Sequence, residues 1–132
     1  MKVEHIGIAV TDLDSSIKKF RQLCPGFDIR IEESKDGSMT IAFLDFENIK
    51  IELMEPKKED TAVGKFIEKH GEGIHHLAVE VQNIVESIDN ARNSNIRVIN
   101  EIPQEGSEGF LVSFIHPKDF NGILLEFCQK QG

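Results

Sequence analysis

The sequence predicts an α+β fold in which two βαβββ modules form one curved eight-stranded mixed sheet with helices on its convex face. Two observations lead to this prediction. The order of strand-like and helix-like segments in the first half of the chain recurs in the second half. A histidine that opens one strand and a glutamate inside a later strand also recur, as His5 and Glu52 and again as His76 and Glu126. The two histidines and the two glutamates are separated along the chain by nearly the same interval, which indicates a duplicated unit.

A chain of 132 residues is predicted to form one domain, spanning 1–132. Module 1 covers about 1–58 and module 2 about 73–130. In module 1, residues 3–10 have the pattern of a strand, and Asp12 or Asp14 can cap a helix over 13–23 that ends at Pro25-Gly26. The strands that follow are expected at 27–33, 39–46 and 49–54. A helix over 60–70, ended by Gly71, connects the modules.

Module 2 repeats this order, with a loop that carries two glycines before its last two strands. Its elements are expected as a strand at 74–81, a helix at 84–94, a short strand at 96–100, a loop at 101–109 and strands at 110–115 and 122–128.

Composition excludes several functional classes. The net charge is −8 and no cluster of Lys or Arg exceeds two residues, so nucleic acid is not an expected partner. No run approaches the roughly 20 apolar residues of a membrane span, and the first residues make a poor signal peptide. Cys24 and Cys128 form no disulfide framework, so the expected location is the reducing cytoplasm.

The two-residue period of a strand predicts which way the recurring polar side chains point. His5 shares a face with Gly7, and His76 shares one with Ala78, so small residues leave space beside both imidazoles. The two glutamates, at 52 and 126, face away from their bulky apolar neighbours. A buried carboxylate is costly unless it is paired or bound to a metal. Imidazole nitrogen and carboxylate oxygen suit a divalent ion such as Co, Zn, Ni, Mn or Fe, so His5, Glu52, His76 and Glu126 are the candidate ligands. His75 alternates to the other face and is not counted.

Four segments carry a resemblance to a known family: HIGIAVTDLDSSIKKF (5–20), IELMEP (51–56), GIHHLAVEVQNI (73–84) and FIHPKDFNGILLEF (114–127). Across essentially its whole length the chain resembles the vicinal-oxygen-chelate (VOC) superfamily, also called the glyoxalase/bleomycin-resistance/dioxygenase fold. Within it the chain is most similar to methylmalonyl-CoA epimerases. His-Pro-Lys at 116–118 is typical of these epimerases, whereas lactoylglutathione lyases usually carry an Asp-Pro-Asp-Gly type of turn there.

The resemblance implies an enzyme that interconverts (2R)- and (2S)-methylmalonyl-CoA, by proton abstraction alpha to the thioester through a metal-stabilised enolate. By position it assigns the metal to His5, Glu52, His76 and Glu126. Glu126 is then expected as the first catalytic base and Glu52 as the second. Some relatives have a glutamate in the third strand where this chain has Thr40, so the identity of the second base stays open. Some epimerases have glutamine in the place of Glu52.

The remaining expectations concern the substrate and the assembly. Lys118 is the candidate for contact with an acidic group of the acyl-CoA substrate, and Lys50, on the same face as Glu52, is a weaker one. The resemblance also implies a homodimer. Two alternatives stay open: a lactoylglutathione lyase (glyoxalase I), which uses the same ligand types, and a non-catalytic drug-binding VOC protein. The four His and Glu residues argue against the second alternative, as does the absence of Trp and Tyr. The acyl group, the native metal and the dimer geometry stay open.

Overall fold

The computed structural model describes all 132 residues and contains eight strands and three α-helices. The elements are β1 (Lys2–Ala9), α1 (Leu13–Leu23), β2 (Asp28–Glu33), β3 (Met39–Asp45), β4 (Lys50–Pro56), α2 (Ala62–His70), β5 (Gly73–Glu80), α3 (Ile84–Asn93), β6 (Gln104–Glu105), β7 (Phe110–Ile115) and β8 (Leu125–Lys130). Short 3-10 turns lie at Ser107–Gly109 and Pro117–Asp119. The predicted α+β class and the βαβββ order of both modules are therefore confirmed.

The chain divides into two compact units. One is His5–His75, and the other combines Met1–Glu4 with His76–Gly132. In the first unit the strands follow the order β2-β3-β4-β1, and in the second β6-β7-β8-β5. Each unit has one parallel pair, β1 with β4 and β5 with β8, and its other pairs are antiparallel. The two units thus repeat one topology.

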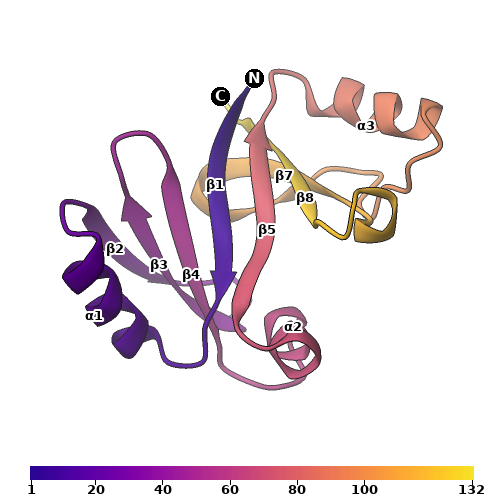
Figure 1. Ribbon diagram of the computed structural model, residues 1–132. Coiled ribbons are helices and arrows are strands. Elements are labelled where there is room, and N and C mark those ends of the chain that lie inside the picture. The colour runs from indigo at the N-terminus through magenta and orange to yellow at the C-terminus, as the bar shows by residue number, and fades with distance from the viewer. The chain divides into compact units, whose positions relative to one another are not determined.

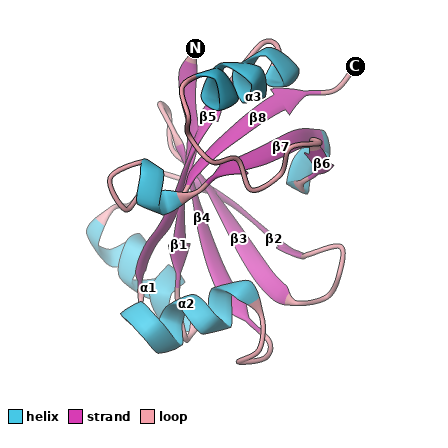
Figure 2. Cartoon of the chain, turned by 90° about the vertical axis from the view of Figure 1, so that its right-hand side faces the viewer, coloured by secondary structure: helices cyan, strands magenta, loops and turns pink.

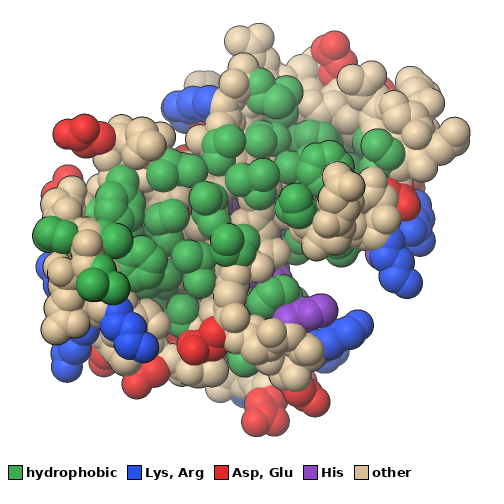
Figure 3. All heavy atoms as spheres, viewed as in Figure 1, with side chains coloured by type: hydrophobic (Ala, Val, Ile, Leu, Met, Phe, Trp, Pro, Cys, Tyr) green, Lys and Arg blue, Asp and Glu red, His purple; other side chains and the backbone are tan.

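Helix α1 covers one face of the strands in the unit His5–His75 (Figure 1). Its apolar stripe forms a core with alternate strand residues, made of Val10, Leu13, Ile17, Ala42, Leu44 and Leu53. Hydrophobic side chains gather in the part of the surface where α1 and β2–β4 lie (Figure 3). A second cluster uses the intervening strand residues and α2, and it contains Ala9, Ile41, Phe43, Met54 and Val63. The strands therefore have one face against α1 and another that shares its apolar residues with α2.

In the other unit, α3 packs against the strands through Ile84, Ile88 and Ala91. Helices α1 and α3 begin in the same way. Asp12 accepts the N–H of Ser15 at 3.1 Å, and Asn83, at the equivalent position of the second module, accepts the N–H of Glu86 at 3.1 Å. Each cap satisfies a backbone donor that the first helical turn leaves without a partner. None of the three helices is long and apolar enough to cross a bilayer.

The prediction of a short strand at 96–100 is wrong. Only Val98 forms an isolated bridge, to Ile115, and the edge strand of this unit is β6, inside the segment expected to be a loop (Figure 2). The side-chain amide oxygen of Asn100 accepts the N–H of Phe114 at 3.0 Å, and Ser113 donates its hydroxyl to the Asn100 carbonyl at 2.6 Å. Side-chain hydrogen bonds thus replace the backbone ladder that would have extended this segment.

Candidate metal site

In the unit His5–His75, the first histidine–glutamate pair lies on the parallel strands β1 and β4. Glu52 is the direct strand partner of Gly7, two residues after His5. Because glycine has no side chain, the Glu52 carboxylate can lean toward the imidazole. The Nδ1 atom of His5 lies 3.2 Å from Oε2 of Glu52. Each of these two residues is 4% exposed, so both donors are buried.

The second pair repeats this arrangement in the other unit. Glu126 on β8 is the direct strand partner of Ala78, again two residues after the histidine. The Nε2 atom of His76 lies 3.3 Å from Oε1 of Glu126. His76 is 5% exposed and Glu126 6% exposed. The predicted site residues are thus brought together in two matching pairs, one in each unit.

Each glutamate also has a phenylalanine on its other side. In the antiparallel ladders, Phe43 is the direct partner of Glu52, and Phe114 is the direct partner of Glu126. The ring of Phe114 also meets His76 edge-on, with 6.1 Å between the ring centroids. A row of small residue, glutamate and phenylalanine therefore crosses three strands in both units, and it surrounds each carboxylate with apolar neighbours.

The donors of both pairs fit a divalent metal. Two ligands that each bind one ion at about 2.0–2.2 Å and at right angles lie about 3 Å apart, close to the separations in both pairs. A charged N–H···O hydrogen bond is shorter, at about 2.7–2.9 Å. Imidazole and carboxylate without thiolate suit Zn, Co, Ni, Mn or Fe. Burial of an acidic side chain is costly, and a bound cation offsets that cost.

Two cations lie beside the first pair. Lys50 shares the face of Glu52 by the two-residue spacing on β4, and it is only 8% exposed. Its Nζ lies 5.6 Å from the ring centroid of Phe43. The guanidinium carbon of Arg30, on β2, lies 4.4 Å from the same centroid. Both distances fall within the range of cation–π attraction. Two positive charges thus lie near the ring that is the direct strand partner of Glu52.

Lys118 lies in the turn between β7 and β8, and its side chain is exposed. His116 Nδ1 accepts the backbone N–H of Lys118 at 3.2 Å. Asp119 accepts three hydrogen bonds from Arg97, two from the guanidinium and one from the backbone N–H, at 2.8–3.1 Å. The guanidinium hydrogen bond, followed by that from the backbone N–H, lowers the pKa of Asp119 to about 2. The His-Pro-Lys sequence is therefore part of an anchored turn.

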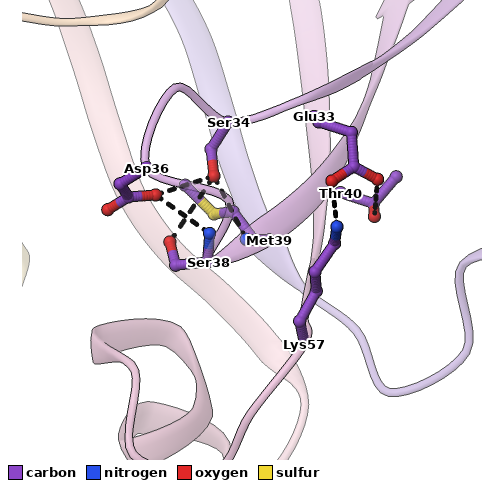
Figure 4. A network of polar contacts seen from close by, with 7 residues as sticks. All are labelled: Glu33, Ser34, Asp36, Ser38, Met39, Thr40 and Lys57. Atoms are coloured by element: carbon purple, nitrogen blue, oxygen red, sulfur yellow. Dashed lines mark hydrogen bonds and ion pairs between the residues drawn. The ribbon is translucent and has the colours of Figure 1, made fainter.

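Thr40 lies on the face of β3 opposite to Phe43, since the two residues are three positions apart. Its hydroxyl donates to Glu33 at 3.3 Å, and Glu33 also forms an ion pair with Lys57 (Figure 4). The hydrogen bond from Lys57 is the main cause that lowers the pKa of Glu33. Thr40 therefore takes part in a surface network and does not project beside Glu52.

The two other histidines near the linking helix contact the same ring. Phe66 of α2 lies 4.9 Å from His75 and 5.0 Å from His70, measured between ring centroids. Burial lowers the pKa of His75, which favours its neutral form. His75 precedes His76 and alternates to the opposite side of β5, so its exclusion from the ligand set stays a prediction.

Arg30 and Phe43 were not among the residues selected from the sequence. Alternation within the strand at 39–46 could have put Phe43 on one face together with Ile41. The sequence did not contain the register that sets Phe43 opposite both Arg30 and Glu52. Register depends on the turns between the strands and on the core, which no single strand reveals.

Comparisons with known proteins agree on one family. The sequence profile of the Glyoxalase/Bleomycin resistance protein/Dioxygenase superfamily matches residues 4–114. An ethylmalonyl-CoA/methylmalonyl-CoA epimerase of Cereibacter sphaeroides is 35% identical over 130 residues, 97% of each chain. A solved structure of a hypothetical protein of Bacillus halodurans has a TM-score of 0.93 and 38% identity, covering 99% of this chain and 95% of that one.

A structure of a methylmalonyl-CoA epimerase in complex with methylmalonyl-CoA and NH4+ is also similar. Its TM-score is 0.88 and its identity 33%, and the match covers 99% of this chain and 95% of that one. These likenesses span almost the entire chain, and they confirm the fold class expected from the sequence.

Proposed function

Because this chain belongs to the glyoxalase/bleomycin resistance protein/dioxygenase superfamily, we propose that it is a metal-dependent methylmalonyl-CoA epimerase. The reaction interconverts the (2R) and (2S) thioesters. The observation that carries the proposal is the repeated buried histidine–glutamate pair, at 3.2 Å and 3.3 Å. The similarity to epimerases at 33–35% identity supports the reaction class and the acyl-CoA substrate.

In this proposal, His5, Glu52, His76 and Glu126 together hold one divalent ion. When bound, the metal supplies Lewis-acid stabilisation of the negative charge that develops on the substrate oxygens. Each imidazole would donate a nitrogen lone pair to the ion, which only the neutral form of the ring offers. The small residues Gly7 and Ala78 beside the glutamates leave space on the side of the histidines.

Glu126 is proposed as the first base. Its carboxylate accepts the proton from the carbon between the thioester and the free carboxylate, and the electron pair of the broken C–H bond stays on the substrate. Glu52 is proposed as the second base, which returns a proton to the opposite face of that carbon. Each base must come within hydrogen-bond reach of the carbon. Both carboxylates are buried, which limits the access of water, a competing proton donor.

Two further parts of the proposal concern binding and assembly. Lys118, exposed in its anchored turn, is proposed to contact an acidic group of the substrate. An acidic protein does not attract an anion through its net charge of −8, so local cations have to do so. The working unit is proposed to be a homodimer.

The test combines metal analysis of the purified protein with an α-proton exchange assay on methylmalonyl-CoA in D₂O. We expect about one metal ion per chain. Exchange should be lost in His5→Ala, and in Glu126→Gln it should be lost on the face of the substrate that Glu126 serves. A parallel assay uses the hemithioacetal of methylglyoxal and glutathione, the substrate of a lactoylglutathione lyase. If the hemithioacetal is turned over and methylmalonyl-CoA exchanges no proton, the function is that of a lactoylglutathione lyase and not of an epimerase. If neither reaction occurs although metal is bound stoichiometrically, both the epimerase and the lyase are ruled out.

A further inference from the structure

Lys50 is a charged side chain in a place that the fold does not require to be charged. It is 8% exposed and lies on β4, beside His5 in the parallel ladder. Removing an ammonium group from water costs several kcal/mol unless other charges or dipoles compensate for it. The ring of Phe43, 5.6 Å from Nζ, supplies part of this compensation. Lys50 is thus a buried cation beside the proposed ligand His5.

The duplication shows what the scaffold alone needs at this position. Glu52 corresponds to Glu126 in the second module, so Lys50 corresponds to Leu124. Each of these residues lies two positions before the glutamate of its module. A half-buried leucine therefore stands at this position in one unit, and the positive charge is a feature of the other unit alone.

The ammonium group of Lys50 is directed toward the row that contains Glu52. The direct antiparallel partner of Lys50 is Asp45, an exposed residue, whereas Phe43 lies two positions along β3. Since Nζ lies over Phe43, the lysine side chain extends from its own row toward the next. Phe43 is the direct partner of Glu52, so the ammonium stands on the side of the proposed base.

We propose that Lys50 binds the free carboxylate of the substrate and thereby selects acyl thioesters that carry one. This inference rests on the proposed function and deepens it. The proposed reaction needs a carbon that lies between a thioester and a carboxylate. A buried ammonium within the same cross-strand rows as His5 and Glu52 offers that carboxylate a charge-assisted hydrogen bond in a site of low dielectric.

Arg30 contacts the same Phe43 ring as Lys50 and helps to position it. Its guanidinium carbon lies 4.4 Å from the Phe43 centroid, and the same side chain forms an ion pair with Glu32. Arg30 is an exposed residue on the edge strand, and its charge holds the Phe43 ring by cation–π attraction. The carboxylate contact itself belongs to Lys50, the buried cation of the two.

The experiment compares malonyl-CoA with acetyl-CoA, two thioesters that differ only by the free carboxylate. Binding of each to the metal-loaded protein is measured by isothermal titration calorimetry, and the ratio of the two affinities is the readout. We expect the wild type to prefer malonyl-CoA, and Lys50→Met to lower the ratio about tenfold or more. Acetyl-CoA affinity should stay within about twofold. Lys50→Arg, which keeps the charge, should retain part of the preference.

Lys2→Met is the matched control, because Lys2 also lies on a strand but its side chain is 70% exposed. Its affinity ratio should equal that of the wild type. A thermal melt of Lys50→Met establishes that this variant folds, as Leu124 at the equivalent position leads us to expect. The inference is overturned if the wild type shows no preference for malonyl-CoA. It is also overturned if Lys50→Met keeps the preference, or if this variant binds both ligands more weakly by the same factor.

The proton-exchange assay separates this inference from the proposed function. If the wild type prefers malonyl-CoA through Lys50 but exchanges no proton of methylmalonyl-CoA, the carboxylate site stands and the epimerase function is ruled out. If the wild type exchanges protons normally and Lys50→Met has an unchanged affinity ratio, the epimerase stands and the carboxylate site at Lys50 is ruled out.

Discussion

Glu52 and Glu126 occupy equivalent places, each between a small residue on one neighbouring strand and a phenylalanine on the other. The small partners are Gly7 and Ala78, and the aromatic partners are Phe43 and Phe114. A carboxylate in such a row has a phenylalanine on one side, a small residue on the other, and the histidine of the adjoining strand as a polar neighbour. The arrangement predicts how each member of the row responds to substitution.

The histidines should differ sharply as ligands. His5→Ala or His76→Ala removes one of the four proposed donors and should abolish stoichiometric metal binding, whereas His75→Ala should leave most of it because His75 packs on Phe66. Metal analysis after dialysis measures this. Equal losses from His75→Ala and His76→Ala would mean that the strand register assumed for the second pair is wrong by one residue.

The two glutamates should differ as bases. Glu126→Gln keeps an oxygen for the metal but loses the basic carboxylate, so epimerisation should fall by about 10²–10⁴-fold while metal is partly kept. Glu52→Gln should block proton exchange on one face of the substrate and leave it measurable on the other. Exchange followed separately from the (2R) and (2S) thioesters in D₂O gives the answer. Near-normal epimerisation by Glu52→Gln would reduce Glu52 to a ligand.

Gly7 should tolerate alanine but not a larger residue. Adjacent strands are about 4.8 Å apart, so a side chain at Gly7 stands directly beside the Glu52 carboxylate. Ala78 fills the equivalent place, so Gly7→Ala should bind metal almost normally. Gly7→Val should weaken metal binding markedly with little change in the far-UV circular dichroism. Equal metal affinity in the two variants would contradict the proposed crowding.

The anchor of the turn at Asp119 should make the protein sensitive to acid. The folded pKa of about 2 lies below the ordinary value of 3.8, so the Arg97 contact stabilises the folded state above about pH 4. That contribution is lost as the pH falls toward 2. Asp119→Asn should therefore lower the Tm at pH 7, and its difference from wild type should shrink near pH 2.5. Asp89→Asn, which alters an exposed contact within α3, is the control.

The assembly is predicted to be a homodimer. Sedimentation velocity at micromolar concentration should give a species of twice the 14.9 kDa chain mass. A clean monomer that retains epimerase activity would remove the dimer from the proposal.

Local sequence signals predicted most of the elements because they act within a few residues. Asp12 caps α1 as expected, and Gly71 ends α2 with a φ of 78°, a backbone conformation that glycine adopts without strain. The segment 96–100 failed because the side chain of Asn100, and not a backbone carbonyl, takes the N–H of Phe114. Such a competition depends on contacts that only the folded chain contains.

For the candidate site, alternation predicted the face of each histidine and glutamate. The pairing of His5 with Glu52 at 3.2 Å could be expected from the duplication, since nearly the same spacing recurs. The cations around Phe43 could not, because they come together through the cross-strand register of three strands. A periodic pattern gives the face of a residue but not its neighbours across the sheet.

The turn between β7 and β8 is where the two halves of the chain cease to match in length. The interval from Phe43 to Phe114 equals that from His5 to His76, whereas the interval from Glu52 to Glu126 is slightly longer. The extra length therefore lies between Phe114 and Glu126, in the segment that contains the Asp119 anchor. Because this segment joins two antiparallel strands, its length can differ from that of its counterpart without displacing either paired strand. Lengthening or shortening this turn would therefore move Lys118 while the donor residues stay unchanged, which offers a route to new selectivity.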